Sequence, residues 1–330
     1  MIRRVLFAIA TPLVALVAVG PVVDRLARRL TEAPRTLPGE ALLRAAVEAL
    51  GGEVVRLRSR DGLRLQGRWI PAEAPPHDAP AGWRPDPHEA ILVLHGYSGS
   101  VTPDMVELAP FLRRTANVLG LDFRGHGASD DGPTTFGYLE TEDVAGALAW
   151  LGERGIQRVA LLGSSMGGIT ALAALAVLGD GRLVAADADP DAPAATVAAP
   201  RPRIVAVVGD SVTPELAIVV ASRVGVPFGR GIANRAFARM AHHIGADPRD
   251  MQPIRTVTLI EDVPLLLVHG DADTTLPIAD GNRLAAAAPP GTTHLVIAGA
   301  GHGDGHRADP ARYEAAVTTH LQSAFMVARS

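Results

Sequence analysis

The chain has 330 residues and no cysteine, and 31 basic and 35 acidic side chains give it a formal net charge of −4. This mild negative charge gives no electrostatic case for nucleic-acid binding, and the lack of cysteine excludes disulfides, thiol nucleophiles and cysteine-ligated metals. Every cationic side chain is an arginine, so Schiff-base chemistry and serine–lysine dyads are excluded as well.

The N-terminus carries an apolar run, residues 5–23, with arginines on both sides and no charged residue inside. At about 1.5 Å per residue, a helix of this length nearly spans a hydrocarbon core of about 30 Å. We therefore expect an uncleaved single-pass membrane anchor within residues 1–30. A cleaved signal peptide, giving a secreted protein, and a buried helix are the alternatives. Pro21 disfavours cleavage after Gly20, and arginines on both flanks leave the orientation open.

Residues 31–50 are expected to be a proline-containing linker followed by a short helix near 40–50. Apolar and polar residues alternate in 53–59 and 63–70, on either side of Asp61-Gly62, which predicts a hairpin with a tight turn. The proline-rich stretch 71–89 predicts a surface loop.

Short apolar runs then alternate with helix-length segments such as 138–154 and 277–288. The runs lie at 90–96, 117–123, 158–163, 203–209, 263–270 and 293–299. This alternation of short apolar runs and helix-length segments predicts an α/β fold in which a mostly parallel sheet is covered by helices on both faces. Ligands bind such sheets beyond the carboxyl ends of the strands, where several of these runs end in Gly, Asp or His.

Two segments depart from this alternation of predicted strands and helices. Residues 179–202 are rich in Asp, Ala and Pro and predict a mobile insertion. Residues 212–258 hold more helix than a crossover needs, which predicts a small helical lid.

The stretch "VALLGSSMGGIT", residues 159–170, fits the pattern G-x-S-x-G with Ser165 at its centre. It follows an apolar strand and precedes a helical pattern, so we expect a sharp strand-to-helix turn that projects the Ser165 hydroxyl into a site. The glycines leave room for the close approach of strand and helix.

A serine hydroxyl needs a base, and the base needs an orienting carboxylate. Downstream of such a turn the expected order is acid, then histidine. "VHGDADTTLP" offers Asp271 and Asp273, and Asp273 is preferred because it sits deeper in its loop. "IAGAGHGDGH" offers His302 and His306; His302 is preferred because it lies in the first turn after the strand, whereas His306 is expected to be solvated.

From about residue 50 to the C-terminus the chain resembles the α/β-hydrolases. The resemblance rests on five motifs in their usual order, "LHGYSGS", "DFRGHGASD", "GSSMGG", "HGDADTTLP" and "GAGHG". It implies an α/β-hydrolase domain over 51–330 with Ser165 as nucleophile, Asp273 as acid and His302 as base. The branch that it resembles most is bacterial, esterase-like serine hydrolases with a small lid, often attached to membranes. The insertion at 179–202 and the absence of lysine depart from the usual pattern.

The oxyanion hole of such an enzyme needs two N–H donors. We expect them to be the backbone amides of Met166, which follows the nucleophile, and Tyr97, in the loop after "ILVLHG". His95, His126 and His269 are expected to have structural roles in their loops and strands rather than to react with substrate.

No metal or other cofactor is expected. Asp187, Asp189 and Asp191 resemble the start of a calcium loop, but Ala192 and Ala198 occupy the positions that need glycine and an acid. His242-His243 lacks a third ligand at metal spacing and is expected on the lid surface.

The sequence therefore predicts a carboxylesterase-like serine hydrolase that acts on small-molecule or lipid-like esters through an acyl-enzyme. An acyl thioesterase or a peptidase of the same fold is the alternative. Four lid arginines, Arg223, Arg230, Arg235 and Arg239, would suit a thioesterase for coenzyme A esters, whereas no paired acid for a peptidase is found. A non-catalytic anchored binding protein is the second alternative.

Overall fold

The computed structural model describes residues 20–33, 35, 39–74, 83–97, 99–178, 201–224, 229–245 and 247–330. Most of the predicted anchor and nearly all of the predicted insertion lie outside the described residues. None of the described helices combines the length and the hydropathy that a membrane crossing requires.

The fold is built on an eight-stranded sheet of order β1-β2-β4-β3-β5-β6-β7-β8. The strands are β1 (Glu53–Arg58), β2 (Arg64–Ile70), β3 (Glu89–Leu94), β4 (Asn117–Leu121), β5 (Arg158–Ser164), β6 (Arg203–Asp210), β7 (Leu265–Gly270) and β8 (Thr293–Ile297). β1 and β2 form the predicted antiparallel hairpin, β2 also runs antiparallel to β4, and all other pairs are parallel. The prediction of a mostly parallel sheet is thus confirmed.

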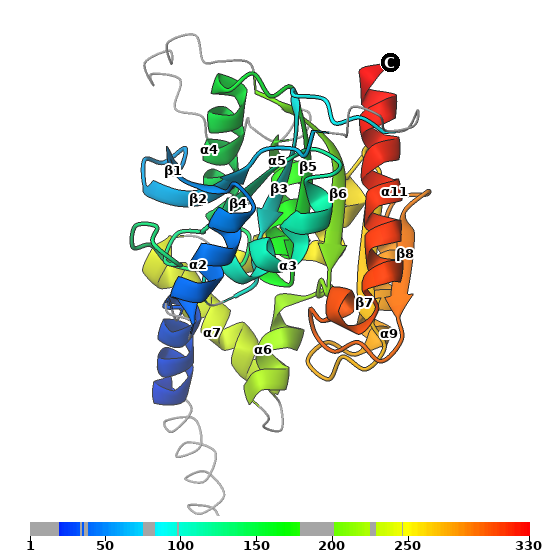
Figure 1. Ribbon diagram of the computed structural model, residues 1–330. Helices are drawn as coiled ribbons and strands as arrows, with labels where there is room; N and C mark the ends of the chain where they lie inside the picture. The colour runs from blue at the N-terminus through cyan, green and yellow to red at the C-terminus, as the bar shows by residue number, and fades with distance from the viewer. Residues whose placement is uncertain are drawn as a thin grey trace, which may run out of the picture.

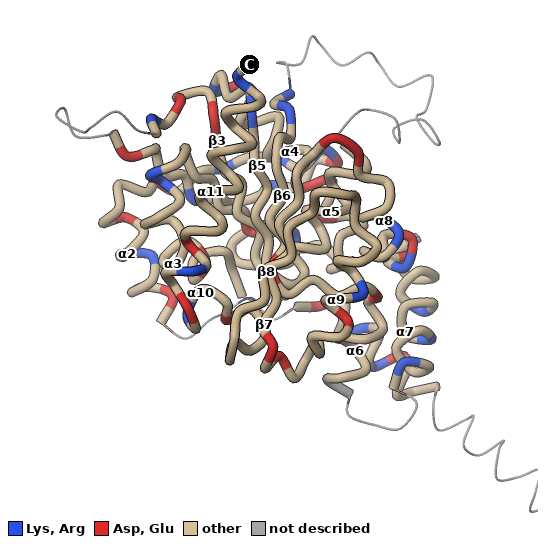
Figure 2. The backbone as a smooth tube through the Cα atoms, turned by 90° about the vertical axis from the view of Figure 1, so that its right-hand side faces the viewer, with Lys and Arg blue, Asp and Glu red and all other residues tan. Residues whose placement is uncertain are grey.

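Helices cover both faces of the sheet, also as predicted (Figures 1 and 2). One face carries α2 (Glu40–Ala49), α3 (Thr102–Leu112) and α11 (Pro310–Arg329), and the other carries α4 (Glu140–Glu153), α5 (Met166–Leu178) and α9 (Ile278–Ala287). A four-residue helix, α10 (Gly305–Ala308), precedes α11.

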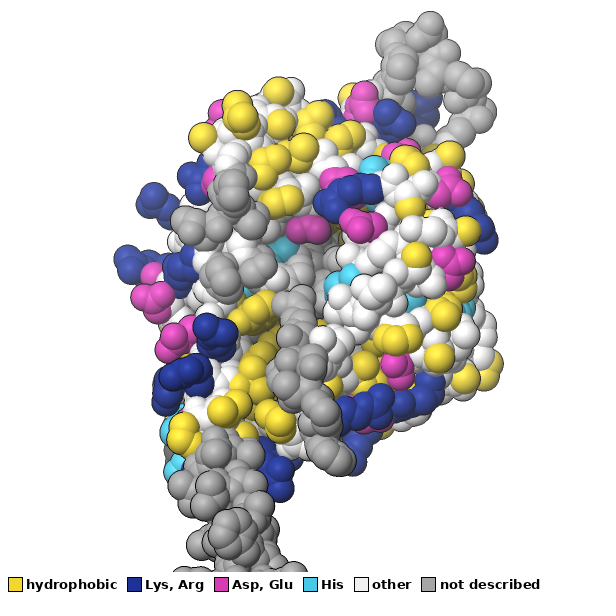
Figure 3. All heavy atoms as spheres, turned by 90° about the horizontal axis from the view of Figure 1, so that it is seen from below, with side chains coloured by type: hydrophobic (Ala, Val, Ile, Leu, Met, Phe, Trp, Pro, Cys, Tyr) yellow, Lys and Arg dark blue, Asp and Glu magenta, His cyan; other side chains and the backbone are white. Residues whose placement is uncertain are grey.

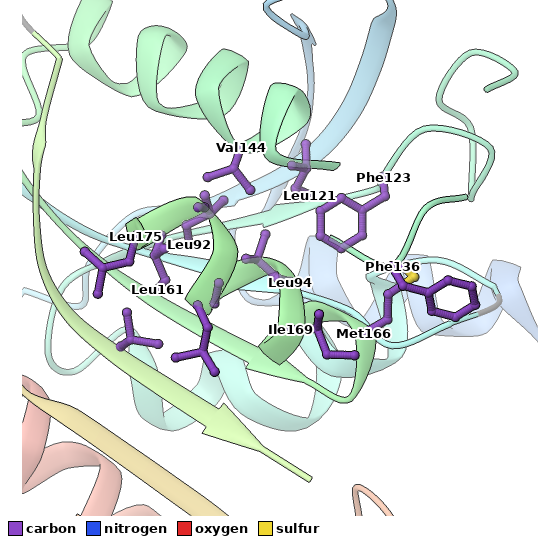
Figure 4. Close-up of a cluster of buried hydrophobic side chains, with 14 of the residues drawn as sticks. Leu92, Leu94, Leu121, Phe123, Phe136, Val144, Leu161, Met166, Ile169 and Leu175 are labelled. Atoms are coloured by element: carbon purple, nitrogen blue, oxygen red, sulfur yellow. The ribbon is translucent and has the colours of Figure 1, made fainter. Parts of the chain in front are cut away.

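The central strands read as continuous apolar runs because both of their faces are buried. In β3, Ile91 and Val93 join the core under α3 and α11, whereas Leu92 and Leu94 join the core under α4 and α5. Figure 4 shows the second of these cores, with Leu92 and Leu94 close to side chains of α5.

Between β6 and β7 the chain forms a helical segment over the carboxyl ends of the strands, where a lid was predicted (Figure 1). It contains α6 (Leu216–Val224), α7 (Gly229–Ile244), α8 (Pro253–Thr256) and 3₁₀ turns at Pro248–Met251 and Val257–Leu259. Helix α7 buries Ala233, Ala236, Phe237 and Met240, which recur at helical spacing, and leaves its arginines exposed.

Residues 20–31 form a helix that packs on the domain. Val23 and Ala27 are buried in the same core as Phe237 of α7. The Arg239 guanidinium of α7 lies 3.3 Å from the Asp24 carboxylate, so this N-terminal helix lies beside α7.

Candidate active site

The turn between β5 and α5 has the geometry predicted for a nucleophile. β5 ends at Ser164, α5 begins at Met166, and Ser165 between them has a φ of +49°. Such a φ is uncommon for a residue other than glycine. A Cβ at Gly167 would overlap the carbonyl oxygen of Leu94, and one at Gly163 would overlap the backbone of Gly167. The glycines therefore permit the close strand–helix approach that exposes Ser165.

The structure brings Ser165, His302 and Asp273 into one hydrogen-bonded chain. His302 Nε2 lies 2.9 Å from Ser165 Oγ, and His302 Nδ1 lies 2.7 Å from Asp273 Oδ2. The three residues follow β5, β7 and β8, so the parallel sheet gathers segments that are 137 and 29 positions apart in the chain.

Asp273 is buried and held by several donors. Its Oδ1 accepts the N–H groups of Thr275 and Leu276, each at 2.8 Å, while Oδ2 faces His302. Burial alone would raise the pKa of Asp273, but the hydrogen bonds from His302, Leu276 and Thr275 outweigh it and lower that pKa. The carboxylate is therefore ionised at neutral pH and can stabilise a protonated imidazole.

The two rejected candidates lie elsewhere. Asp271 accepts the N–H of Gly299 at 2.6 Å and is exposed. His306 was expected to be solvated, and this was wrong. Its ring is only 15% exposed, because it lies between Glu107 and Glu314 and stacks on Phe111.

The loop after β3 lies against Ser165. A Cβ at Gly96 would be 3.7 Å from Cβ of Ser165. Buried His95 fixes this loop, because its Nδ1 donates to the Gly96 carbonyl at 2.6 Å and its Nε2 accepts the Phe123 N–H at 3.1 Å. Burial lowers the pKa of His95 to about 3, so the ring is neutral and has the structural role predicted for it.

Tyr97 and Met166, the residues predicted to supply the oxyanion donors, line the same cavity as Ser165. The N–H of Met166 is in the first turn of α5, where the helix supplies no acceptor. Tyr97 follows Gly96 in the loop against Ser165. Its side chain stacks on Phe136 with ring centroids 5.5 Å apart, and its hydroxyl donates to the Arg29 carbonyl at 2.6 Å. This hydrogen bond to the N-terminal helix was not predicted from the sequence.

An apolar cavity opens beside Ser165. Its wall includes Leu30 of the N-terminal helix, Phe136, Ile169 of α5 and three residues of α6, Leu216, Val219 and Val220. Figure 4 shows Phe136, Met166 and Ile169 close together at one end of the core, and Figure 3 shows hydrophobic side chains gathered on this face of the molecule. A larger open groove lies between α11 and the start of β6 and β7, and it contains none of the three residues of the hydrogen-bonded chain.

Two polar residues at the end of β6 were not predicted from the sequence: Asp210, the last residue of the strand, and Ser211, which follows it. Both are buried, and the Ser211 hydroxyl accepts the N–H of Gly303, next to His302. The pattern "VVGDS" at a strand end could have pointed to them.

Among the described residues, no group of three or more His, Asp or Glu side chains could hold a metal ion, and the calcium-like aspartates lie outside those residues.

Comparisons with known proteins bear on the family and the fold of the chain. The sequence model of the Alpha/beta hydrolase family matches residues 91–316. The uncharacterized protein YfhR of Escherichia coli (strain K12) is 25% identical over 264 residues, which cover 77% of this chain and 78% of that protein. YfhR of Salmonella typhi is 26% identical over 241 residues, covering 72% and 69%.

Solved structures share the fold. The Pyrococcus furiosus esterase Pf2001 has a TM-score of 0.61 and 20% identity, with 88% of this chain and 98% of that chain covered. A bacterial membrane phospholipase A has a TM-score of 0.56 and 17% identity, with 98% and 99% covered. The esterase RhEst1 from a Rhodococcus species has a TM-score of 0.53 and 18% identity, with 82% and 99% covered.

Proposed function

Because the chain belongs to the alpha/beta hydrolase family, we propose that it is a serine hydrolase that cleaves carboxylic esters with Ser165, His302 and Asp273. The observation that carries this proposal is the continuous hydrogen-bonded chain from Asp273 through His302 to the hydroxyl of Ser165. The esterases among its structural neighbours support the choice of ester substrates.

The reaction proceeds in two halves. Ser165 Oγ attacks the ester carbonyl carbon while His302 Nε2 takes its proton, and the Asp273 carboxylate stabilises the imidazolium. The backbone N–H groups of Met166 and Tyr97 donate to the oxyanion. The C–O bond then breaks, and the alcohol leaves with the proton from His302. His302 then takes a proton from water, and the oxygen of that water attacks the acyl carbonyl carbon. The bond between this carbon and Ser165 Oγ breaks, His302 returns the proton to Ser165 Oγ, and the acid leaves.

The apolar cavity beside Ser165 favours a lipophilic acyl group, because Leu30, Phe136, Ile169 and the α6 residues offer it almost no polar partners. The bacterial membrane phospholipase A among its structural neighbours adds to the case for lipid-like esters.

Labelling with a fluorophosphonate probe tests the proposal. We expect wild type to be labelled and to hydrolyse a series from acetyl to palmitoyl esters, and Ser165→Ala to lose both activities, because the probe reacts only with an activated serine. Ser164→Ala is the matched control: it changes the neighbouring hydroxyl and should still be labelled. Absence of labelling in folded wild-type protein would favour the non-catalytic binding protein instead.

A second candidate function, hydrolysis of coenzyme A thioesters, is favoured by the charge of the lid. Helix α7 carries Arg230, Arg235 and Arg239, all exposed, and its sequence contains no acidic residue. The thioesterase function would be supported if the KM for acyl-CoA rose steeply with salt concentration and ester hydrolysis were weak.

We also propose that residues 5–23 anchor the protein in a membrane as a single pass. Their apolar sequence supports this, and exposed Arg25, Arg28 and Arg29 follow the run at the position of an interface. The helix at 20–31 would then place the lid and the cavity close to the bilayer, where lipid-like esters are concentrated.

We expect the full-length protein to stay in the membrane pellet after an alkaline carbonate wash. The variant Leu13→Arg/Leu16→Arg should be released, since each arginine near the centre of a spanning helix costs about 2.5–3.5 kcal/mol. Leu42→Arg, at a side chain that is 80% exposed, is the control and should remain in the pellet. Recovery of soluble wild-type protein with a shortened N-terminus would support the secreted alternative.

A further inference from the structure

Asp210 ends β6 directly beside the nucleophile turn, yet the proposed reaction does not use it. Its backbone carbonyl accepts the N–H of Ser165 at 2.8 Å, and its residue exposure is only 4%. A buried carboxylate is costly unless the structure compensates it, so its presence here needs a physical reason.

The Asp210 side chain is linked to the loop of the proposed base. Ser211 Oγ donates to Asp210 Oδ1 at 2.9 Å and accepts the N–H of Gly303, also at 2.9 Å. Ser211 has a φ of +53°, a conformation that sets its hydroxyl between the two groups at the cost of backbone strain. The hydroxyl of Tyr313 in α11 also hydrogen-bonds to Asp210. One carboxylate therefore ties β6, the His302 loop and α11 together.

Asp210 lines a small polar cavity together with Ser164, the residue before the proposed nucleophile. The titratable or charged groups that face it come from every neighbouring element: Asp104 and Glu107 of α3, His269 of β7, His302 in its loop, and His306, Arg307 and Tyr313 of α10 and α11. Burial raises the pKa of Asp210 to about 6, while the hydrogen bond from Ser211 and the histidines His302 and His269 oppose that rise. Asp210 is therefore ionised above about pH 6 and interacts favourably with protonated His302.

We propose that Asp210 is a second positioning carboxylate for the hydrolase site. Through Ser211 it holds the backbone of Gly303, and with it His302, in place against Ser165, and its negative charge stabilises the imidazolium that forms during the reaction. The proposal rests on the function proposed above and adds a residue to the site. Asp273 orients the ring from its Nδ1 side, and Asp210 fixes the loop that carries the ring.

The first test is an NMR titration of the His302 imidazole, assigned by comparison with His302→Gln. Replacing Asp210 with asparagine keeps the shape of the side chain but removes its charge. We expect the midpoint of the His302 titration to fall by about 0.5–1 pH unit in Asp210→Asn, because the imidazolium loses a nearby anion. The titration requires no hydrolysis, so it decides the role of Asp210 even if the chain proves not to be a hydrolase.

Kinetics separate the two parts of the proposal. In Asp210→Asn we expect kcat to fall about tenfold with KM unchanged and the acid limb of the pH profile to move to lower pH. Ser211→Ala breaks the link to Gly303 but keeps the charge, so kcat should fall by a similar factor while the acid limb stays in place. Asp104→Asn is the matched control, since it neutralises an acid of the same cavity without touching Ser211.

Stability distinguishes positioning from a general structural role. A carboxyl group with a raised pKa weakens the folded state as pH rises through that pKa, so Asp210→Asn should have a Tm at about pH 8 equal to or above that of wild type. Lower activity without lower stability supports the proposal. It is overturned if the His302 midpoint does not move in Asp210→Asn, or if kcat and Tm fall together.

Discussion

His302→Ala is expected to lower kcat/KM for a short-chain ester by about 10⁴-fold, mostly through kcat. Its Nε2 lies 2.9 Å from the hydroxyl of Ser165, and the other candidate, His306, is held between Glu107 and Glu314. A serine hydroxyl without a base remains protonated at neutral pH and is a poor nucleophile. Initial rates of hydrolysis for purified wild type and variant measure the effect.

Asp273→Asn should cost nearly as much, about 10²–10⁴-fold, because an amide in place of the carboxylate favours the wrong tautomer of His302 and leaves the imidazolium unstabilised. Adding it to His302→Ala should cause little further loss, since residues that act as a unit are not additive.

The matched controls are Asp271→Asn and His306→Gln, one for each rejected candidate. The Asp271 carboxylate accepts the N–H of Gly299, whereas the carboxylate that contacts His302 is that of Asp273. Replacing Asp271 should therefore change kcat/KM less than about tenfold. Equal losses in Asp271→Asn and Asp273→Asn would mean that the acid has been assigned to the wrong position.

The fold was predictable because its signals are local. Continuous apolar runs predicted β3, β5, β6 and β7 as buried parallel strands, and glycines marked the turn at Ser165. Because the carboxyl ends of parallel strands lie at one edge of a sheet, the motifs of Ser165, Asp273 and His302 could be predicted to lie close together. Asp273 was preferred for its depth in its loop and His302 for its place in the first turn after its strand, and in the structure these two are the residues in contact.

Contacts between distant segments were not predictable. Neither Leu30 nor Arg29 belongs to a motif, yet both reach the site because the helix at 20–31 packs beside α7. Asp210 and Ser211 were overlooked for a similar reason: an aspartate at a strand end is recognised as part of a site only when its partner, here the N–H of Gly303, is known. His306 was expected in solvent because nothing in its sequence neighbourhood reveals Glu107 of α3.

The largest effect on stability is expected from Arg124, in the motif "DFRGHGASD". Its side chain is 2% exposed and donates to Asp143 through Nε and Nη2 at 3.0 and 2.7 Å, and to the carboxylate of Asp61. Asp143 is fully buried and also accepts the Arg124 backbone N–H at 2.9 Å. Arg124→Leu removes the cation and leaves a buried carboxylate unpaired, which destabilises a folded protein by about 3–5 kcal/mol. Urea unfolding compared with wild type measures this loss.

The pH dependence of that loss has a definite sign. Burial raises the pKa of Asp143, and hydrogen bonds from Arg124 oppose the rise, so in Arg124→Leu the pKa of Asp143 should be higher still. A carboxyl group with a raised pKa stabilises the fold less as pH increases through that pKa, and the variant should therefore be least stable at alkaline pH and recover part of its stability in mild acid. Arg124→Leu/Asp143→Leu, which removes both charges, should be more stable than Arg124→Leu alone. If the double variant is no more stable than Arg124→Leu, the loss of stability in the single variant comes from disturbed packing around Phe123 and not from an unpaired charge. The N–H of Phe123 donates to His95, which in turn holds the loop of Tyr97.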